Sequence, residues 1–596
     1  MVAGLCDLYR TAAARTPGAN VFQHREDERW QPVTAGEFMQ RAEACAAGLR
    51  AAGLEPGDRL GILAVNGIDW ELSQCAALLA GVTVVGIDPQ ETPARQALML
   101  ASAGVVALAI DTPHRLAPLP EATRAALRAV ICFSTAHAPP SAPPWWTPAK
   151  LIALALPPLG ETPAGHADAI IIFTSGSTGL PRAIVYRHEQ LARAVTGLLA
   201  TFPQLQGGDR LLCWLPLANL FQRMINVCGF AAGACSWLLA EPRELRAGLR
   251  AARPHWLVGV PRFYEKFYDG LQQEIAGLAW PLRRIARWAL AIGASYSAVL
   301  RAGRAPGSAL RLRHALAEAL VLRRLRAPLG GAVRAALSGS APCPPRVLEG
   351  LHACGLLVLE AYGLSENILP VAMNRPDDYE FGTVGRPLPG NELALSPDGE
   401  ILVRGPCVFS GYLHDADVPL AIDERGFLHT GDLGAFTAQG RLQITGRMGE
   451  LFKTSTGRKV APAPLEAVLR QLPGVAQAVV FGAGQKCVVA VLTPAPEDAA
   501  ALERPAAFSA WAMRAAAAVP LLCAGLPPLL TPGAVLCDRR ALSVANDDLT
   551  VNLKLRRPTL AMRYRPALTQ VYAGLEGGAL AGSHVALGPD LLCCYL

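Results

Sequence analysis

One short stretch constrains this chain more than any other: an apolar run, Ala169–Phe173, that ends abruptly in the sequence TSGSTG. The run predicts a buried strand, and the six small residues after it leave their backbone N–H groups accessible. Further donors come from the hydroxyl groups of Thr174, Ser175, Ser177 and Thr178. Such a loop can wrap phosphate oxygens. Its spacing fits neither a Walker loop nor a dinucleotide fingerprint, so an ordinary surface turn remains the alternative.

The first 110 residues alternate helical and strand-like patterns. Asp58–Asn66 is a short apolar strand, and Trp70–Pro89 has the pattern of a helix, a glycine break and a strand. This alternation predicts a parallel sheet covered by helices. With 596 residues, of which 52% are apolar, the chain can bury large cores and is too long for one ordinary domain.

Composition and charge exclude several classes of protein. A net charge of +7 is too small for this length to indicate nucleic-acid binding. No run approaches the ~18 apolar residues of a membrane-spanning helix, and the first ten residues lack the apolar core of a signal peptide. The 15 cysteines form no CxxC pair and no cluster with metal-ligand spacing. These features predict reduced thiols in a cytoplasmic protein.

Two segments differ from the alternating pattern. Residues 112–165 are rich in proline and alanine, which predicts a loop or a poorly ordered connection. Residues 273–326 carry ten arginines against only Glu274 and Glu318, with apolar and cationic residues at helical spacing. We interpret the second segment as a basic helix hairpin. Two interpretations of this hairpin remain open. It is either a solvated face or a peripheral contact with acidic lipid head groups at the inner face of the membrane.

Several weaker patterns follow. Glu360–Asn367, EAYGLSEN, offers an aromatic ring to stack on a base and a carboxylate, Glu366, that suits Mg²⁺. Asp432 lies on a glycine turn and can accept two hydrogen bonds from a ribose diol. Arg447, in GRMGE, can bind ribose or neutralise phosphate, and Lys554 is a cation framed by apolar residues. Each pattern is weak alone, and their significance lies in their order.

In this order the motifs resemble those of the adenylate-forming superfamily, which includes acyl-CoA synthetases, peptide-synthetase adenylation domains and luciferases. TSGSTGLPR is similar to its phosphate loop, and YGLSE, TGD and GR-x-x-E…TSTGRKVAP are similar to its later motifs. VPRFYEK, the long insert after it and LTVNLKLRR most resemble the long-chain fatty acid branch. The resemblance covers about residues 35–557. It implies an α/β fold with a large N-terminal domain, residues 1–447, made of two αβ subdomains and a β-rich subdomain. A small, mobile α+β C-terminal domain, residues 448–596, would follow.

The reaction that the resemblance implies has two steps. A carboxylate attacks the α-phosphate of ATP to give acyl-AMP and pyrophosphate, and the thiol of coenzyme A then takes the acyl group and releases AMP. Because an anion approaches a polyanion, the protein must supply positive charge and positioning more than a base. Two alternatives stay open: an acyl-AMP ligase that loads a carrier protein, and a protein that binds ATP without turnover.

The resemblance also implies residue roles. The β- and γ-phosphates would be cradled by Thr174, Ser175, Gly176, Ser177, Thr178 and Gly179, with Arg182 where the family usually has lysine. Glu366 with Ser175 or Thr174 would hold Mg²⁺. The rest of the nucleotide site would comprise Gly339, Ser340, Ala341, Glu360, Ala361, Tyr362, Gly363, Ser365, Asp432, Arg447 and Gly457. Lys554 would bridge the reacting carboxylate and the α-phosphate, so the predicted catalytic residues are Lys554, Glu366 and Arg447.

The chain also departs from the family pattern. Leu215–Met224 resembles the family's LPL-x-H-x-x-E-R segment near the acyl pocket, which predicts Asn219 and Phe221 as substrate contacts. Asn219 replaces histidine there, and Gln222 replaces a glutamate, which removes a charge beside the expected substrate entrance. Gly449 is predicted to be the interdomain hinge because glycine is the most permissive residue for a change of φ and ψ. The residues after 557 have a loose composition and contain no carrier domain.

Overall fold

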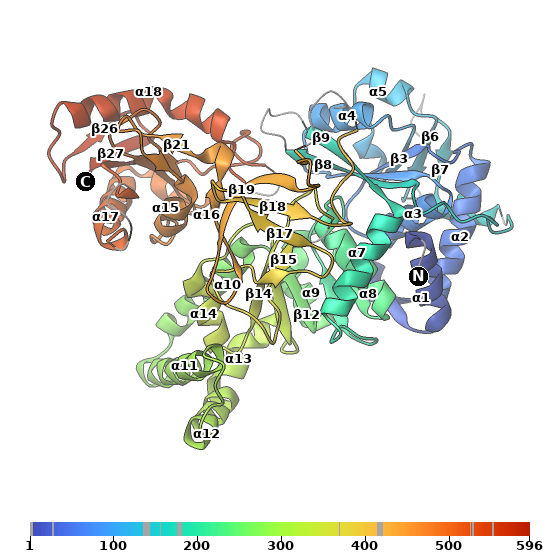
Figure 1. Ribbon diagram of the computed structural model, residues 1–596, viewed down its shortest axis with the longest axis horizontal. Coiled ribbons are helices and arrows are strands. Elements are labelled where there is room, and N and C mark those ends of the chain that lie inside the picture. The colour runs from blue at the N-terminus through green and yellow to red at the C-terminus, as the bar shows by residue number, and fades with distance from the viewer. Residues whose placement is uncertain are drawn as a thin grey trace. The chain divides into compact units, whose positions relative to one another are not determined.

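The structure is a computed structural model that describes residues 4–26, 29–134, 143–154, 156–175, 181–368, 370–413, 421–524, 526, 530–550 and 554–596. The chain divides into two compact units (Figure 1). Unit 1 comprises Met1–Ala394, Leu402–Thr430 and Phe436–Gln443. Unit 2 comprises Leu395–Ile401, Gly431–Ala435 and Ile444–Leu596. The domain boundary between residues 447 and 448 stays a prediction.

Unit 1 contains the predicted parallel sheet of the N-terminal region. This seven-stranded sheet has the order β7-β6-β5-β3-β4-β8-β9, and all neighbours are parallel except β8 and β9. The bounds are Arg59–Leu63 (β3), Thr83–Ile87 (β4), Ala107–Ile110 (β5), Ala129–Cys132 (β6), Trp145–Trp146 (β7), Asp168–Ser175 (β8) and Pro181–Arg187 (β9). Strands β4, β5 and β6 are wholly buried, as expected for parallel strands covered on both faces.

A second, nine-stranded sheet of unit 1 has the order β16-β15-β14-β13-β12-β10-β11-β1-β2. Its middle strands are parallel, and antiparallel strands close both edges. The bounds are Asn20–Glu26 (β1), Arg29–Thr34 (β2), Arg210–Cys213 (β10), Cys235–Leu238 (β11), Trp256–Gly259 (β12), Ala335–Ser338 (β13), Val358–Tyr362 (β14), Ala372–Met373 (β15) and Arg386–Pro387 (β16).

Helices cover these sheets (Figure 1). Their bounds are Leu5–Arg15 (α1), Ala35–Ala51 (α2), Ile68–Leu79 (α3), Pro93–Ser102 (α4), His188–Thr201 (α7), Leu220–Ala232 (α8), Pro242–Glu244 (η2), Leu245–Ala252 (α9), Pro261–Gly277 (α10) and Pro345–Ala353 (α14). Within the described ranges, no helix of this chain has the length and apolar character needed to cross a bilayer.

The prediction that residues 112–165 form only a loop is wrong. The described part of this segment contains β6 and β7 of the seven-stranded sheet and three short helices, Pro113–Arg115 (η1), Glu121–Ala125 (α5) and Pro148–Ala153 (α6). The four residues of β6 are buried against β5, and β6 in turn pairs with β7. Strands of two to four residues show too little periodicity to be recognised in a proline-rich sequence. Their formation depends on pairing with neighbouring strands of the sheet.

The predicted basic helix hairpin of residues 273–326 is present. It consists of Trp280–Arg301 (α11) and Ser308–Ala317 (α12), followed by a π-helical turn, Glu318–Leu322 (η3), and by Arg323–Arg326 (α13) and Ala327–Leu329 (η4). Figure 1 shows α11 and α12 extending from unit 1 beyond α14. Tyr296 of α11 stacks on His314 of α12 with ring centroids 3.9 Å apart.

The β-rich region that the sequence predicts contains four strands, Glu392–Leu395 (β17), Glu400–Arg404 (β18), Leu428–Phe436 (β19) and Leu442–Arg447 (β20). The remainder of unit 2 begins with a short helix, Met448–Glu450 (η5), and a hairpin of Phe452–Lys453 (β21) and Lys459–Val460 (β22). A five-stranded sheet, β23-β24-β25-β27-β26, follows. Its bounds are Gln477–Phe481 (β23), Val489–Thr493 (β24), Ala534–Asp538 (β25), His584–Ala586 (β26) and Leu591–Tyr595 (β27), and the helices are Pro462–Leu469 (α15), Pro496–Ala499 (α16), Ala500–Glu503 (η6), Pro505–Leu522 (α17) and Arg557–Glu576 (α18).

The residues after 557, expected to be of loose composition, are folded. They form the 20-residue helix α18 and strands β26 and β27, and β27 pairs antiparallel with β25 along its whole length. Cys593 and Cys594 are buried in this sheet. The C-terminal segment is therefore part of the core of unit 2.

Candidate functional site

The predicted phosphate loop joins the two antiparallel strands β8 and β9 at the edge of the seven-stranded sheet. Thr174 pairs with Arg182, and Ser175 pairs with Pro181, which closes the described part of this hairpin. Residues 176–180 and the side chain of Ser175 lie outside the described residues. The roles predicted for Ser175, Gly176, Ser177, Thr178 and Gly179 therefore stay predictions.

Glu366 is held close to this hairpin by two tyrosines. Tyr412 donates a hydrogen bond from its hydroxyl group to Glu366 Oε1 at 3.0 Å, and the Arg182 guanidinium lies over the Tyr412 ring, 5.2 Å from its centroid. The buried Tyr186 of β9 donates to the carbonyl oxygen of Ser365. Burial and the nearby charge of Glu366 raise the pKa of Tyr412 to about 12, so this phenol remains a hydrogen-bond donor. The structure thus places Arg182 and Glu366 in contact with the same tyrosine, and their predicted roles stay predictions.

Tyr412 is a candidate site residue that the sequence did not reveal. It lies in the β-rich segment directly after Gly411, without a spacing that links it to Glu366. Its bridge to Ile184 of β9 places it at the site. Only the tertiary arrangement supplies this signal.

The nucleotide-site residues predicted in unit 1 lie at the carboxyl ends of two neighbouring parallel strands. Glu360, Ala361 and Tyr362, predicted to line the adenine together with Gly339–Ala341, are the last three residues of β14 itself. Gly339–Ala341 come directly after β13, and Gly363–Glu366 come directly after β14, which pairs with β13 in parallel. Ligands of α/β sheets bind outside the carboxyl ends of such strands. Ser340 has a φ of 75°, in the left-handed region that residues other than glycine seldom adopt. The two loops therefore lie next to each other at one edge of the nine-stranded sheet.

Glu360 is a buried carboxyl group at the end of β14. Its side chain is 3% exposed, and Oε1 accepts a hydrogen bond from the backbone N–H of Cys343 at 2.9 Å. Burial raises the pKa of Glu360 from 4.5 to about 7, although backbone hydrogen bonds from Cys343 and Gly382 partly oppose this. The folded protein therefore holds a proton at Glu360 at a pH where the unfolded chain has lost it.

This proton predicts a pH dependence of stability. Because the folded-state pKa is the higher one, Glu360 lowers the stability of the native state as the pH rises from about 5 to 7, with no further change above. Glu360→Gln removes this contribution. Its unfolding free energy relative to wild type should increase by about 2–3 kcal/mol between about pH 5 and pH 8. Denaturant unfolding of both proteins at the two pH values checks this, and a difference that is the same at both would contradict it.

An apolar cavity of about 80 Å³ lies inside unit 1, beside the strands β13 and β14 that lead into the predicted nucleotide loops. Its wall consists of Leu198, Leu199, Phe202, Leu205, Leu211, Phe221, Met224, Ile225, Cys228, Trp256, Val258, Leu337, Ala361, Ile368, Pro370 and Met373. One wall residue, Ala361, is itself a predicted nucleotide contact, and another, Leu337, lies two residues before Gly339. The cavity is small for a long acyl chain, so flexible wall residues such as Met224 must move to admit one.

Both predicted substrate residues lie at the start of α8. Phe221 lines the cavity, and a Cβ atom on Gly339 would lie 3.3 Å from its ring, so the ring packs directly against this glycine. Asn219 is the N-cap residue of α8, with extended backbone angles, and its carbonyl oxygen accepts from the N–H of Arg223 at 3.4 Å. The pairing of Phe221 with Gly339 joins the predicted acyl and nucleotide regions.

Gln222 is not among the residues that line this cavity, and its predicted place beside the substrate entrance stays a prediction. It is fully buried, and its Nε2 donates to Asn226 Oδ1 at 3.0 Å, whose Nδ2 in turn donates to Glu71 Oε1 at 2.7 Å. Burial raises the pKa of Glu71 to about 7 and lowers that of the neighbouring Arg223 to about 10. A carboxyl group is thus present in this network after all, supplied by α3. The sequence gives no spacing that links Glu71 to Gln222, because the two residues lie in helices far apart in the chain.

Unit 2 carries the predicted ribose contacts. Arg447 Nε donates to Asp432 Oδ1 at 2.5 Å, and Asp432 is 4% exposed whereas the Arg447 side chain is half exposed. The structure therefore brings this predicted pair together. Gly457 occupies the turn between β21 and β22 with a φ of +78°.

Lys554 is exposed, and its backbone is held next to Thr550. Its N–H donates to Thr550 Oγ1 at 3.1 Å, and its carbonyl oxygen accepts from the N–H of Thr550 at 2.8 Å. The buried carboxylate of Asp548 pairs with Arg563 of α18 at 2.6 Å. The segment that carries Lys554 is thereby fixed to α18 within unit 2.

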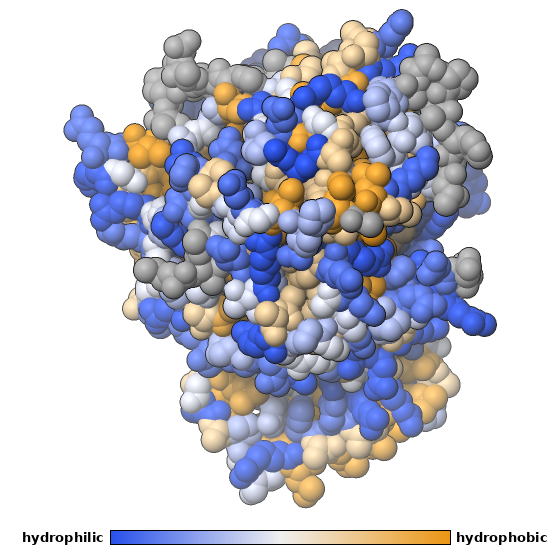
Figure 2. All heavy atoms as spheres, turned by 90° about the vertical axis from the view of Figure 1, so that its right-hand side faces the viewer, coloured by the Kyte–Doolittle hydropathy of each residue, from blue (hydrophilic) through white to orange (hydrophobic). Residues whose placement is uncertain are grey.

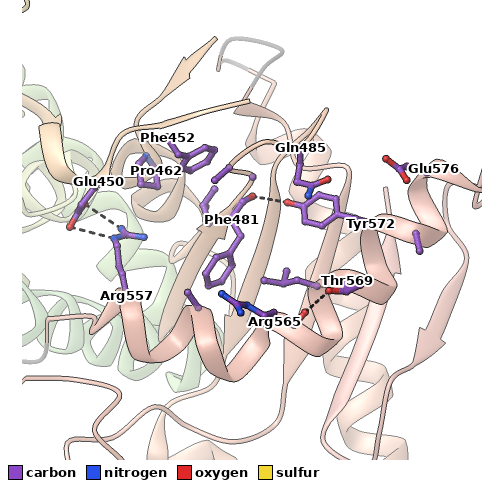
Figure 3. A pocket seen from close by; sticks show the side chains of 16 residues that line it. Glu450, Phe452, Pro462, Phe481, Gln485, Arg557, Arg565, Thr569, Tyr572 and Glu576 are labelled. Atoms are coloured by element: carbon purple, nitrogen blue, oxygen red, sulfur yellow. Dashed lines mark hydrogen bonds and ion pairs between the residues drawn. The ribbon is translucent and has the colours of Figure 1, made fainter. Parts of the chain in front are cut away.

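The predicted hinge Gly449 lies in η5, next to a groove of about 700 Å³ between β23 and α18 (Figure 3). Gly449 is not among the residues with positive φ, and a Cβ atom there would meet nothing within 4 Å. In this conformation the position does not require glycine, so its hinge role stays a prediction. At one end of the groove, Arg557 contacts Glu450 and forms two hydrogen bonds with Glu466, at 2.6 and 2.8 Å.

No group of three or more histidine, cysteine, aspartate or glutamate side chains that could hold a metal ion occurs among the described residues. The oxygen donors predicted for Mg²⁺ are a carboxylate, Glu366, and the hydroxyl groups of Thr174 or Ser175. Hard oxygen atoms of this kind suit Mg²⁺, which takes few protein ligands and binds substrate phosphates instead. The donor set therefore fits the ion.

Known proteins resemble this chain over most of its length. Residues 9–413 match the AMP-binding enzyme family, and residues 450–515 match the AMP-binding enzyme C-terminal domain. The long-chain-fatty-acid–CoA ligase FadD15 of Mycobacterium bovis is 34% identical over 510 residues, which is 84% of this chain and 82% of the relative. Long chain acyl-CoA synthetase 1 of Arabidopsis thaliana is 29% identical, over 82% of this chain and 79% of its own.

Solved structures share the fold. The A-PCP didomain of carboxylic acid reductase from Segniliparus rugosus, in complex with AMP, superposes with a TM-score of 0.76 at 21% identity, over 97% of this chain and 83% of that chain. ATP-bound MatB from Rhodopseudomonas palustris gives a TM-score of 0.69 at 20% identity, over 94% and 99%. The adenylate-forming fold predicted from the motifs is confirmed. With its phosphate-loop hairpin, strand-end loops and C-terminal lysine segment, this chain belongs to the AMP-binding enzyme family.

Proposed function

We propose that this protein activates a long-chain fatty acid with ATP, as acyl-AMP, and transfers the acyl group to coenzyme A with release of AMP and pyrophosphate. Relatives from Mycobacterium bovis and Mycobacterium tuberculosis, 34% and 33% identical to this chain, are named as long-chain-fatty-acid–CoA ligases. The observation that carries the proposal for this chain is the apolar cavity, because every wall residue is apolar and Phe221 packs on Gly339 of the predicted nucleotide loop. An apolar acid with its carboxylate at the nucleotide suits this arrangement.

In this proposal each unit contributes part of the chemistry. Arg182 of unit 1 supplies positive charge to the phosphates, and Glu366, oriented by Tyr412, holds Mg²⁺ with Thr174 or Ser175. Bound Mg²⁺ would neutralise phosphate charge. Asp432 and Arg447 bind the ribose, and Lys554 stabilises the charge that develops between the carboxylate and the α-phosphate.

Pyrophosphate release with a panel of saturated acids of increasing chain length, with CoA or holo-carrier protein as acceptor, tests the proposal. We expect release with long acids and thioester formation on CoA. Transfer to the carrier protein alone would support a carrier-loading ligase, which the names of the relatives do not favour. ATP binding without release for any acid would indicate a protein that has lost turnover.

The hinge at Gly449 gives a separate prediction. Gly449→Pro restricts φ at this position and removes an N–H, so one domain arrangement should become inaccessible. We expect at least one half-reaction, acyl-AMP formation or thioester formation from supplied acyl-AMP, to slow by about tenfold or more. Gly449→Ala is the matched control and should have a smaller effect. Single-turnover assays of both half-reactions check this, and wild-type rates in both would refute the hinge.

A further inference from the structure

The outer face of α11 and α12 exposes an unusual number of large apolar side chains. Of the eighteen large hydrophobic residues that are exposed among the described residues, eight lie between positions 280 and 320: Trp280, Leu282, Ile285, Trp288, Leu300, Leu312, Leu316 and Leu320. Leu312 is 75% exposed and Trp280 is 63% exposed. Single exposed apolar residues need no explanation, but a contiguous group of them marks an interaction surface.

These side chains follow helical stripes. Trp280, Arg284 and Trp288 are spaced four residues apart on α11, opposite the buried positions Ala289 and Gly293. Arg284 lies over the Trp280 ring, 5.5 Å from its centroid. A second stripe runs through Leu312, Leu316 and Leu320. The stripe on α11 therefore combines two exposed tryptophans with an arginine, whereas Leu282 and Leu300 lie on another side of this helix.

The same segment concentrates positive charge. Residues 273–326 contain ten arginines and two glutamates, a net charge of +8, whereas the whole chain has +7. The remaining 542 residues together thus carry −1. One of the two glutamates, Glu318, is already paired with Arg326. At the lower end of Figure 2, which α11 and α12 form in Figure 1, hydrophobic and hydrophilic side chains alternate on the surface.

We propose that α11 and α12 dock this protein on the surface of a bilayer that contains anionic lipids. Arginine guanidinium groups bind lipid phosphates, each near-surface cation adding to the attraction. Tryptophan favours the boundary between head groups and acyl chains, and the exposed leucines can insert beneath it. A nucleic-acid surface would need the cations but would leave Leu312 and Leu316 without a partner. Docking on a bilayer does not depend on the proposed ligase activity. Only the suggestion that docking helps the protein to collect an amphiphilic acid rests on the proposed function.

Co-sedimentation of the full-length protein with vesicles, without substrates, tests the proposal. Phosphatidylcholine vesicles are compared with vesicles that also contain phosphatidylglycerol, at low and high salt. We expect binding to the anionic vesicles, weakened by salt. Arg284→Gln with Arg287→Gln should lower the partition coefficient by roughly tenfold. Trp280→Ser with Leu312→Ser should lower it at both salt concentrations, because it removes inserted apolar area.

Matched controls come from other exposed positions. Arg246→Gln with Arg250→Gln removes two exposed arginines from α9, and Leu521→Ser removes a side chain that is 85% exposed on unit 2. Both controls should bind vesicles as the wild type does. The proposal is overturned if the protein does not bind the anionic vesicles, or if the hairpin variants bind them as well as the controls do. It is also overturned if a parallel assay with RNA shows hairpin-dependent binding while the vesicles show none. Circular dichroism spectra and denaturant unfolding curves like those of the wild type would show that the variants remain folded.

Discussion

Lys554→Ala is expected to slow acyl-AMP formation by about 10²–10³-fold, because it removes the ammonium group predicted to stabilise charge between the carboxylate and the α-phosphate. Conversion of supplied acyl-AMP to the thioester should stay within a few-fold of wild type, since that step no longer involves the pyrophosphate leaving group. Lys554 is exposed, and its backbone is held next to Thr550, so its side chain can be removed without loss of folding.

Separate assays of the two half-reactions test this role. Lys486→Ala, which removes an exposed lysine from the turn between β23 and β24, is the control and should leave both rates unchanged. Equal loss of both half-reactions in Lys554→Ala would contradict the assignment. Wild-type adenylation in Lys554→Ala would exclude Lys554 from the reaction altogether.

Arg557→Leu is expected to lower the unfolding free energy of unit 2 by about 3 kcal/mol, because it leaves Glu466 as an unpaired buried charge. Arg557 holds Glu466 through two hydrogen bonds, and the same carboxylate accepts from the N–H of Val480 at 2.8 Å (Figure 3 shows the Glu450 side of this cluster). Glu466 is 6% exposed, so water cannot replace the lost partner well. Denaturant unfolding followed in unit 2, for example through hydrogen exchange of β23, measures the effect.

Two further variants identify the cause. Arg565→Leu changes an exposed arginine on the same helix and should be close to neutral. Arg557→Leu combined with Glu466→Gln removes both charges but keeps a side-chain oxygen for the Val480 N–H, and it should recover most of the lost stability. If the double variant is as unstable as the single one, the loss arises from packing of the Arg557 stem and not from the unpaired carboxylate.

The motif residues that the sequence singled out fall into separate groups whose members lie near one another. Arg182 and Glu366 meet through Tyr412, Phe221 packs on Gly339, and Arg447 contacts Asp432. The sequence could anticipate that the loops of Gly339 and Glu366 are neighbours, because they follow the parallel strands β13 and β14, whose carboxyl ends share one edge of the sheet. Asp432 and Arg447 instead lie within the strands β19 and β20, not on a turn. The buried network of Gln222, Asn226 and Glu71 could not be anticipated, because its members come from α8 and α3, far apart in the chain.

Local pattern was also a poor guide where long-range pairing supplies the stability. Strand β6 lies in a proline-rich segment and β27 in a tail of loose composition, yet both are buried by pairing with β5 and β25. The residue types and their order along this chain were enough to predict the fold class, the family and the two-step chemistry. This was possible because the small hydroxyl residues, the carboxylates and the late lysine occur in short motifs that can be recognised without knowing the tertiary structure. Tertiary structure alone decided which side chains orient Glu366, where the apolar cavity lies and that the basic hairpin exposes its apolar residues, because each depends on contacts between segments distant in sequence.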